Sequence, residues 1–288
     1  MTTAVAPSSF RERFFTSQDG LRLYVRDYGT PRRDQPTLLC LPGVTRNSKD
    51  FHRLATRLAP RWRVLCPDYR GRGESDSDPD WRNYQPRTYL DDIRHLLVAF
   101  NIRRVAIIGT SLGGILAMAM AVVFPTMVAG AALNDIGPTL ESRGLGNIVT
   151  YMKDDRPMAD WPAAVLRLRT TFPDLPAKTD ADWLMLARMV YREDSNGRVV
   201  FGWDPAIVKP ILRGVPLSDL WPLFSALGDR PTLVLRGARS SVLSEDTVQR
   251  MKTKLPTLRS VTVPDVGHTP ALTEPEAETA LDEFLARL

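Results

Sequence analysis

The sequence predicts an α/β protein, in which a mostly parallel, doubly wound β-sheet carries an inserted segment of helices. Through most of the 288 residues, short apolar runs alternate with stretches of helical period. This alternation is typical of parallel strands joined by crossover helices. It stops at about residue 138 and resumes after Leu217, and the sequence between them indicates several helices and no convincing apolar strand.

The first half of the chain begins with a predicted hairpin. Segments 14–16 and 21–28 flank the turn Gln18-Asp19-Gly20, and an Asp-Gly pair between alternating segments favours a β-hairpin. Amphipathic helices are expected from about residue 48 to 58 and over 89–101. Strands without alternation, which are typical of strands buried on both faces, are predicted at 37–41, 64–66, 105–108 and 128–133.

The second half resumes the alternation of strands and helices. A short helix after Leu217 is followed by predicted strands at 231–235 and 259–263 and by predicted helices at 245–254 and 274–288. We therefore expect residues 1–137 and 217–288 to form one core domain. Residues 138–216 are predicted to form a helical cap over the carboxyl edge of the sheet, where α/β folds hold their binding sites.

The clearest functional motif is Gly109-Thr110-Ser111-Leu112-Gly113, between an apolar run and a helix of small and apolar residues. This is Gly-x-Ser-x-Gly in a strand–turn–helix context. A serine on such a sharp turn exposes its hydroxyl, and the glycines let strand and helix approach closely. The N–H groups at the start of the helix can stabilise negative charge near the serine. The alternative is a glycine-rich turn before a core helix.

A serine hydroxyl needs a neighbouring base to act as a nucleophile, and the chain offers three histidines. His52 and His95 lie off the apolar faces of their predicted helices, which favours surface positions. His268 lies directly after the strand at 259–263, at the edge where Ser111 also emerges. We predict that Ser111 and His268 meet within hydrogen-bonding distance.

Four signatures follow one another in a familiar order: Leu41-Pro42-Gly43-Val44, the segment 68–75, the Ser111 motif and Gly267-His268. In this respect the chain resembles the α/β-hydrolase superfamily over nearly its whole length, as a serine hydrolase with a helical cap. The resemblance implies an oxyanion hole formed by the backbone N–H groups of Val44 and Leu112. Pro42 replaces a histidine that is common in this loop, which leaves the backbone donor intact. A serine nucleophile argues against the members that use aspartate.

The acid that would orient His268 departs from the family pattern. Members commonly carry it in a Gly-x-x-Ser-Asp-like turn after the strand at 231–235, but here the turn reads Gly237-Ala238-Arg239-Ser240-Ser241. Ser241 therefore stands where an aspartate is expected. A serine cannot stabilise an imidazolium as a carboxylate does, and losing the acid of a triad costs about 10⁴ in kcat.

Asp135 is the candidate substitute because it follows the strand at 128–133, a position from which some relatives supply their acid. Two interpretations stay open: Asp135 orients His268, or it caps the next helix or fixes the Gly137-Pro138 turn. Glu245 and Asp246 are weaker candidates, since they are better explained as acidic residues in the first turn of a helix.

The predicted cap suggests an apolar pocket. Most of its aromatic residues and methionines are expected to form its own core, while a subset faces the sheet and lines a pocket for an acyl or alcohol group. We name Trp161, Trp183 and Met189 as candidate substrate contacts, together with Arg46 beside the oxyanion loop, which could meet a carboxylate or carbonyl. No residue cluster suggests a metal or an organic cofactor.

Composition narrows the partners and the compartment. The net charge is +5, but the arginines are scattered and no basic run is interleaved with aromatics, so we expect no nucleic-acid partner. Cys40 and Cys66 are expected as buried free thiols, and neither a signal peptide nor a membrane span is indicated. We therefore expect a cytoplasmic protein that acts on a small apolar ester-like molecule. A homodimer is compatible with the sequence.

These observations predict the hydrolysis of a small to medium carboxylic ester or lactone through an acyl-enzyme intermediate. One alternative uses the same residues to cleave a carbon–carbon bond in a dienoate or β-diketone. Another alternative is a homologue that binds a small ligand without turnover, with Ser241 as a sign of lost activity. The presence of both Ser111 and His268 argues against the second alternative.

Overall fold

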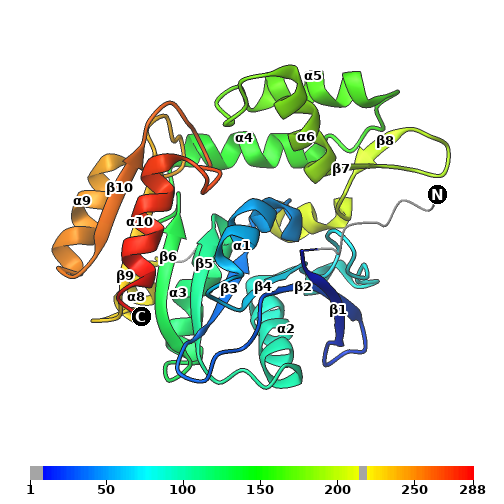
Figure 1. The fold of residues 1–288 in the computed structure, drawn as a ribbon. Coiled ribbons are helices and arrows are strands. Elements are labelled where there is room, and N and C mark those ends of the chain that lie inside the picture. Colours follow the sequence, from blue (N-terminus) through cyan, green and yellow to red (C-terminus); the bar gives the residue numbers. More distant parts are fainter. Residues whose placement is uncertain (1–8, 214–218) are drawn as a thin grey trace, which may run out of the picture.

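A computed structural model describes residues 9–213 and 219–288 of the chain, with the sheet at its centre (Figure 1). Within these residues, eight strands pair in the order β1-β2-β4-β3-β5-β6-β9-β10. They are β1 (Arg11–Thr16), β2 (Arg22–Tyr28), β3 (Thr37–Leu41), β4 (Val64–Pro67), β5 (Val105–Thr110), β6 (Val128–Asn134), β9 (Thr232–Gly237) and β10 (Arg259–Val263). The pairs β1–β2 and β2–β4 are antiparallel, and those from β4 to β10 are parallel. The predicted fold class is confirmed.

Helices cover both faces of the sheet, as its burial pattern requires. In β3, Leu38 and Cys40 point to one face and Leu39 and Leu41 to the other, and all four side chains are fully buried. One face packs against α1 (His52–Leu58) and α10 (Pro275–Leu285). The opposite face packs against α2 (Pro86–Ala99), α3 (Leu112–Val123), α8 (Trp221–Ser225) and α9 (Glu245–Lys254). Because both faces are covered, the central strands are apolar throughout.

Between β6 and α8 the chain leaves the sheet and forms an insertion, defined here as residues 138–213. It contains α4 (Ser142–Lys153), α5 (Trp161–Thr171), α6 (Asp180–Val190), β7 (Tyr191–Glu193), β8 (Val199–Phe201), the 3₁₀ helix η3 (Pro205–Val208) and α7 (Lys209–Leu212). Its helices α4, α5 and α6 lie beyond one edge of the sheet (Figure 1). The predicted junction at 216–217 and Leu217 itself lie outside the described residues.

The expectation that this segment lacks strands is wrong, because β7 and β8 form an antiparallel pair. Each strand has only three residues, too few for an alternating pattern to stand out. The turn between them did carry a signal: Asn196-Gly197 is a hairpin dipeptide, and Gly197 adopts the positive φ of 75° that such a turn needs.

Parallel pairing brings the carboxyl ends of β3, β4, β5, β6, β9 and β10 to one edge of the sheet. The loop after β3 leads into the 3₁₀ helix η1 (Ser48–Phe51), and the loop after β4 leads to the 3₁₀ helix η2 (Trp81–Asn83). α2 begins at Pro86 rather than near Tyr89, since proline is favoured in the first turn. In the described parts of the chain, every helix is too short or too polar to cross a membrane.

Candidate active site

Ser111 lies on the turn between β5 and α3, in a strained conformation with φ 51° and ψ −113°. Such values are rare for a residue other than glycine, and they persist only where the surroundings enforce them. The flanking glycines allow the tight packing. A Cβ on Gly109 would lie 2.4 Å from the carbonyl carbon of Gly113, and a Cβ on Gly113 would lie 2.0 Å from the carbonyl oxygen of Leu41. The turn therefore requires glycine at both positions.

His268 and Asp135 meet Ser111 from two other loops. His268, after β10, has its Nε2 atom 3.0 Å from Ser111 Oγ, and its Nδ1 atom lies 2.7 Å from Oδ2 of Asp135, which directly follows β6. The Asp135 side chain is completely buried, whereas His268 is partly exposed. The three side chains form a continuous hydrogen-bonded line of hydroxyl, imidazole and carboxylate, which is the geometry that activation of a serine requires.

The carboxylate of Asp135 is held by the turn after β9. Its Oδ1 atom accepts a hydrogen bond from the Gly237 N–H at 2.8 Å, and its Oδ2 atom accepts one from the Ser240 hydroxyl at 2.6 Å. Asp135 therefore does not cap the next helix, whose N-cap residue is Glu141. Glu245 and Asp246 lie in the first turn of α9, as expected.

The structure corrects the role assigned to Ser241. Its side chain is exposed, and its backbone carbonyl lies against Gly144 in the insertion. Ser240 is the residue of this turn that faces Asp135, and it also accepts hydrogen bonds from the N–H groups of Val242 and Leu243. In this turn the side chain that contacts Asp135 is therefore that of Ser240 and not that of Ser241, because the conformation of the turn decides which side chain points inward.

Asn134 joins the three segments that carry Ser111, His268 and Asp135, and sequence reasoning missed it. Its Nδ2 atom donates to Thr110 Oγ1 and to the carbonyl oxygen of Pro270, both at 3.0 Å. Its own backbone carbonyl accepts a hydrogen bond from Ser111 N–H at 3.1 Å. The side chain is 1% exposed. A polar residue at the end of an otherwise apolar strand was the signal that could have identified it.

Val44 and Leu112 lie on either side of Ser111. Leu112 is the first residue of α3, and Val44 lies in the loop after β3. This loop approaches the nucleophile closely, since a Cβ on Gly43 would lie 3.8 Å from Ser111 Cβ. The two segments that carry the Val44 and Leu112 N–H groups thus both lie next to Ser111.

A cavity of about 700 Å³ opens above Ser111 and His268. The insertion supplies much of its apolar wall, namely Ile148, Tyr151, Leu168, Phe172, Leu175, Met185, Leu186, Met189 and Val190. Of the four predicted substrate contacts, Arg46 and Met189 line this cavity. Its size and mixed lining are typical of a site for a small organic molecule.

Trp161 and Trp183 do not line the cavity, and this prediction is corrected. Trp161 donates from Nε1 to Glu193, the last residue of β7. Trp183 is 4% exposed and packs within the insertion, with the Arg169 guanidinium 5.8 Å from its ring centroid. Helical spacing marks both residues as apolar-facing, but it cannot distinguish the core of the insertion from the cavity wall.

Arg46 is held at the cavity wall by Asp50. Its Nε and Nη2 atoms bind the two carboxylate oxygens at 2.8 and 2.7 Å, and its side chain remains 23% exposed. Burial alone would lower the pKa of Arg46, but the Asp50 carboxylate, with smaller contributions from Tyr151 and Tyr191, raises it. The guanidinium is therefore a fixed cation near the nucleophile.

The other two histidines lie elsewhere. His52 Nδ1 lies 3.1 Å from the Tyr28 hydroxyl, and His95 Nδ1 lies 2.8 Å from the Asp91 carbonyl oxygen in the same helix. Both side chains are partly buried and each has a hydrogen bond of its own, so the expectation of surface positions is met only in part. His268 is thus the histidine at the candidate site.

Comparison with known proteins identifies the class to which this fold and site belong. The model of the alpha/beta hydrolase family matches residues 38–283, and the chain therefore belongs to that family. An alpha/beta hydrolase from Novosphingobium aromaticivorans has a solved structure that is 42% identical. The match covers 98% of this chain and 100% of the chain in that structure, with a TM-score of 0.92.

Two curated relatives carry more specific names. The chain is 30% identical to a 3-hydroxybutyrate-oligomer hydrolase from Cupriavidus necator, over 91% of this chain and 92% of that protein. It is 27% identical to a 2-(acetamidomethylene)succinate hydrolase from Mesorhizobium japonicum, over 86% of this chain and 85% of that protein. The family and the names of these relatives support a hydrolase.

Proposed function

We propose that this protein hydrolyses a small to medium carboxylic ester or lactone through an acyl-enzyme intermediate on Ser111. The observation that carries the proposal is the hydrogen-bonded line from Ser111 Oγ through His268 to the buried Asp135, at the base of a cavity. A hydroxyl with a base 3.0 Å away, and a base with a carboxylate 2.7 Å away, has the geometry of an activated nucleophile.

The reaction follows from these contacts. Ser111 Oγ attacks the substrate carbonyl while His268 Nε2 takes its proton, and Asp135 stabilises the imidazolium that results. The N–H groups of Val44 and Leu112 donate to the oxyanion, each contribution being worth about 3–4 kcal/mol. His268 then returns the proton to the departing alcohol, which leaves an acyl group on Ser111. In the second half of the reaction, His268 takes a proton from a water molecule that attacks this acyl group, and it then returns the proton to Ser111 Oγ as the acid is released.

The relative from Cupriavidus necator suggests the first substrate to test, a linear dimer of 3-hydroxybutyrate. Such an oligomer is an ester that ends in a carboxylate. Arg46 supports this choice because it places a cation on the cavity wall, with Nε and Nη2 held by Asp50 and with the remaining edge of the guanidinium available for a second anion. We propose that Arg46 binds the carboxylate end of the substrate.

Labelling with a fluorophosphonate probe tests the nucleophile. The wild-type protein should react and Ser111→Ala should not, because the probe needs an activated hydroxyl. Turnover should then be measured on p-nitrophenyl esters of increasing chain length, on the 3-hydroxybutyrate dimer and on a dienoate ring-cleavage product. An unlabelled wild-type protein would contradict the proposal, and turnover of the dienoate alone would favour carbon–carbon bond hydrolysis.

The role of Arg46 is tested with a pair of substrates, the 3-hydroxybutyrate dimer and its methyl ester. Arg46→Gln should raise KM for the free acid by about 10- to 100-fold, since a charge-assisted hydrogen bond is worth about 1.5–3 kcal/mol. KM for the methyl ester should change little. Arg53→Gln is the matched control, because Arg53 is another cavity-lining arginine. Equal effects on both substrates would contradict this role.

A further inference from the structure

The two carbonyl groups that flank the Gly43–Val44 segment are both held by side chains from the loop after β4. Tyr69 donates from its hydroxyl to the Pro42 carbonyl oxygen at 3.2 Å. Arg72 donates from Nε to the Val44 carbonyl oxygen at 3.0 Å. The peptide between them carries the Val44 N–H that the proposed reaction directs at the oxyanion.

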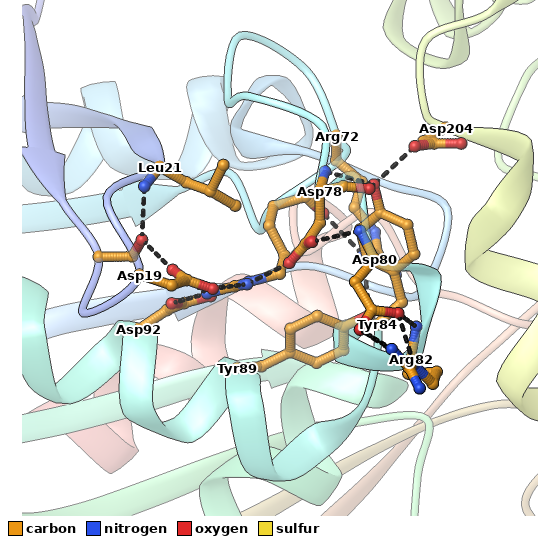
Figure 2. Close-up of polar contacts among 12 residues, drawn as sticks. Asp19, Leu21, Arg72, Asp78, Asp80, Arg82, Tyr84, Tyr89, Asp92 and Asp204 are labelled. Atoms are coloured by element: carbon orange, nitrogen blue, oxygen red, sulfur yellow. Dashed lines mark hydrogen bonds and ion pairs between the residues drawn. The ribbon is translucent and has the colours of Figure 1, made fainter.

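Both donors are rigidly packed. Tyr69 is 3% exposed and Arg72 is 1% exposed. The Tyr69 ring stacks on the Tyr89 ring at 5.2 Å between centroids. Arg72 Nη1 donates to the Tyr89 hydroxyl at 2.9 Å (Figure 2). Arg72 Nη1 also donates to the Arg70 carbonyl oxygen at 2.9 Å. Burial raises the pKa of Tyr69, so its hydroxyl keeps the proton that it donates.

Arg72 differs sharply from its neighbour Arg70. The Arg70 guanidinium forms ion pairs with Asp19, Asp78 and Asp92, the usual solution for a buried charge. Within residues 9–213 and 219–288, no carboxylate forms an ion pair with Arg72. Burying a guanidinium without a counterion is costly, and its hydrogen bonds to backbone carbonyls and aromatic side chains must offset that cost.

The insertion fixes the same loop from the other side. Residue Arg72 forms an antiparallel bridge with Trp203, and the Gly73 N–H donates to the Gly202 carbonyl oxygen at 3.0 Å. The Tyr84 hydroxyl, which packs beside Arg72, donates to Asp204 at 2.6 Å (Figure 2). The loop that holds the Val44 segment is thus anchored in both the sheet and the insertion.

We infer that Tyr69 and Arg72 are positioning residues that hold the Gly43–Val44 peptide in place for stabilisation of the oxyanion. The inference rests on the proposed function and extends it to two side chains that do not line the cavity. Each side chain fixes one carbonyl beside this peptide, and the peptide's own carbonyl, that of Gly43, accepts a hydrogen bond from the Arg46 N–H at 3.1 Å. Rotation of the Val44 N–H would break this last bond, while Tyr69 and Arg72 hold the peptide planes on either side. Charge that develops on the substrate oxygen then meets a donor that is already oriented.

Two variants test the inference. Tyr69→Phe removes one hydroxyl and keeps the ring, and Arg72→Met removes the guanidinium and keeps most of the apolar stem. Each should lower kcat/KM by about 10- to 100-fold, less than the loss of an oxyanion donor outright, and kcat should carry most of the change. Affinity for a phenylboronic acid, which forms a tetrahedral adduct on the serine, should fall in parallel, while affinity for the carboxylic acid product should stay constant.

Tyr84→Phe is the matched control. It lies in the same network and loses the hydrogen bond to Asp204, but its hydroxyl has no bond to the Val44 segment. Its kcat/KM should stay within about threefold of wild type. Arg72→Lys, which can still donate one hydrogen bond, should recover part of the activity that Arg72→Met loses.

The outcomes separate this inference from the proposed function. If the wild type neither reacts with the fluorophosphonate nor cleaves esters, the proposed function fails and this inference fails with it. If the wild type is active and Tyr69→Phe keeps both its kcat/KM and its boronic acid affinity, the inference alone is overturned. If Arg72→Met does not fold, Tyr69→Phe still decides the result, because thermal unfolding of that variant can be compared directly with wild type.

Discussion

The loops on the two sides of Ser111 are built differently. On the acid side, after β6, β9 and β10, side chains bind one another: His268 contacts Asp135 at 2.7 Å, and Ser240 donates to the same carboxylate at 2.6 Å. On the opposite side, after β3 and β4, the two side chains that hold the Gly43–Val44 segment bind its backbone instead. There Tyr69 and Arg72 donate to carbonyl groups at 3.2 and 3.0 Å.

This difference follows from what each side has to supply. Proton transfer needs particular side chains, so the acid side depends on residue types such as histidine and aspartate. Oxyanion stabilisation needs a backbone N–H, which almost every residue has, so the other side depends on how firmly the backbone is held. Substitutions on the acid side should therefore change the chemistry, and those on the opposite side should change the positioning.

The largest effect is expected at Asp135. Asp135→Asn should lower kcat by about 10³- to 10⁴-fold, because the amide leaves the imidazolium without its carboxylate and favours the wrong tautomer. Steady-state kinetics on a p-nitrophenyl ester measures the loss. If Asp135→Asn keeps the kcat of the wild type, Asp135 is not the acid that orients His268.

A rescue experiment sharpens this result. In the Asp135→Asn background, Ser240→Asp should restore part of the activity, because the Ser240 hydroxyl lies 2.6 Å from the Asp135 carboxylate that it would replace. Ser241→Asp in the same background is the control and should restore nothing, since the Ser241 side chain is exposed. Rescue by Ser241→Asp instead would contradict the assignment of Ser240 as the inward-facing residue.

An intermediate effect is expected at Asn134, which ties the acid side to the nucleophile. Asn134→Ala should lower kcat by about 10- to 100-fold with little change in KM, because Thr110 and the Pro270 carbonyl lose their shared donor. The free energy of unfolding should fall by about 1–3 kcal/mol, since the variant leaves that buried carbonyl oxygen without the donor. A change in stability with unchanged kcat would show that Asn134 serves folding alone.

Asp68 allows a test of stability on the side opposite the acid. It is buried and accepts hydrogen bonds from the N–H groups of Ser48 and Glu74 at 2.6 and 2.9 Å. Burial raises its pKa from 3.8 to about 6, although these N–H donors oppose the shift. The folded protein therefore binds more protons than the unfolded chain between about pH 4 and 6.

Stability should consequently fall as the pH rises through this window, by up to about 3 kcal/mol from Asp68. Asp68→Asn has no such proton to lose. The free energies of unfolding of wild type and Asp68→Asn should be measured in urea at pH 4, 5, 6 and 7. The value for wild type minus the value for the variant should decrease up to pH 6 and then level off. A constant difference across the series would contradict the raised pKa.

The smallest effect is expected at Ser240. Ser240→Ala removes one hydrogen-bond donor from the Asp135 carboxylate, which keeps the Gly237 N–H and His268 as partners. Steady-state kcat on a p-nitrophenyl ester should therefore fall by no more than about tenfold, the worth of one hydrogen bond. A loss as large as that of Asp135→Asn would show that Ser240 does more than donate one hydrogen bond.

How far the sequence predicts the site depends on whether its signals are local. Ser111 was identified from five consecutive residues, because the strained turn needs small neighbours at fixed positions. His268 followed from its place directly after a strand. For Asp135 the sequence left two interpretations open, and the hydrogen bonds to His268 and Ser240 are not visible in it.

The sequence by itself determined the sheet, its covering helices and the motif around Ser111, because apolar periodicity and turn chemistry act between near neighbours. Tertiary structure alone decided that Ser240 rather than Ser241 points inward, that Trp161 and Trp183 stay out of the cavity, and that Tyr69, Arg72 and Asn134 hold the loops. Each of these depends on which side chain faces a partner from a distant part of the chain. The direction in which each side chain points is set by packing at the carboxyl edge of the sheet, where six loops and the insertion contact one another.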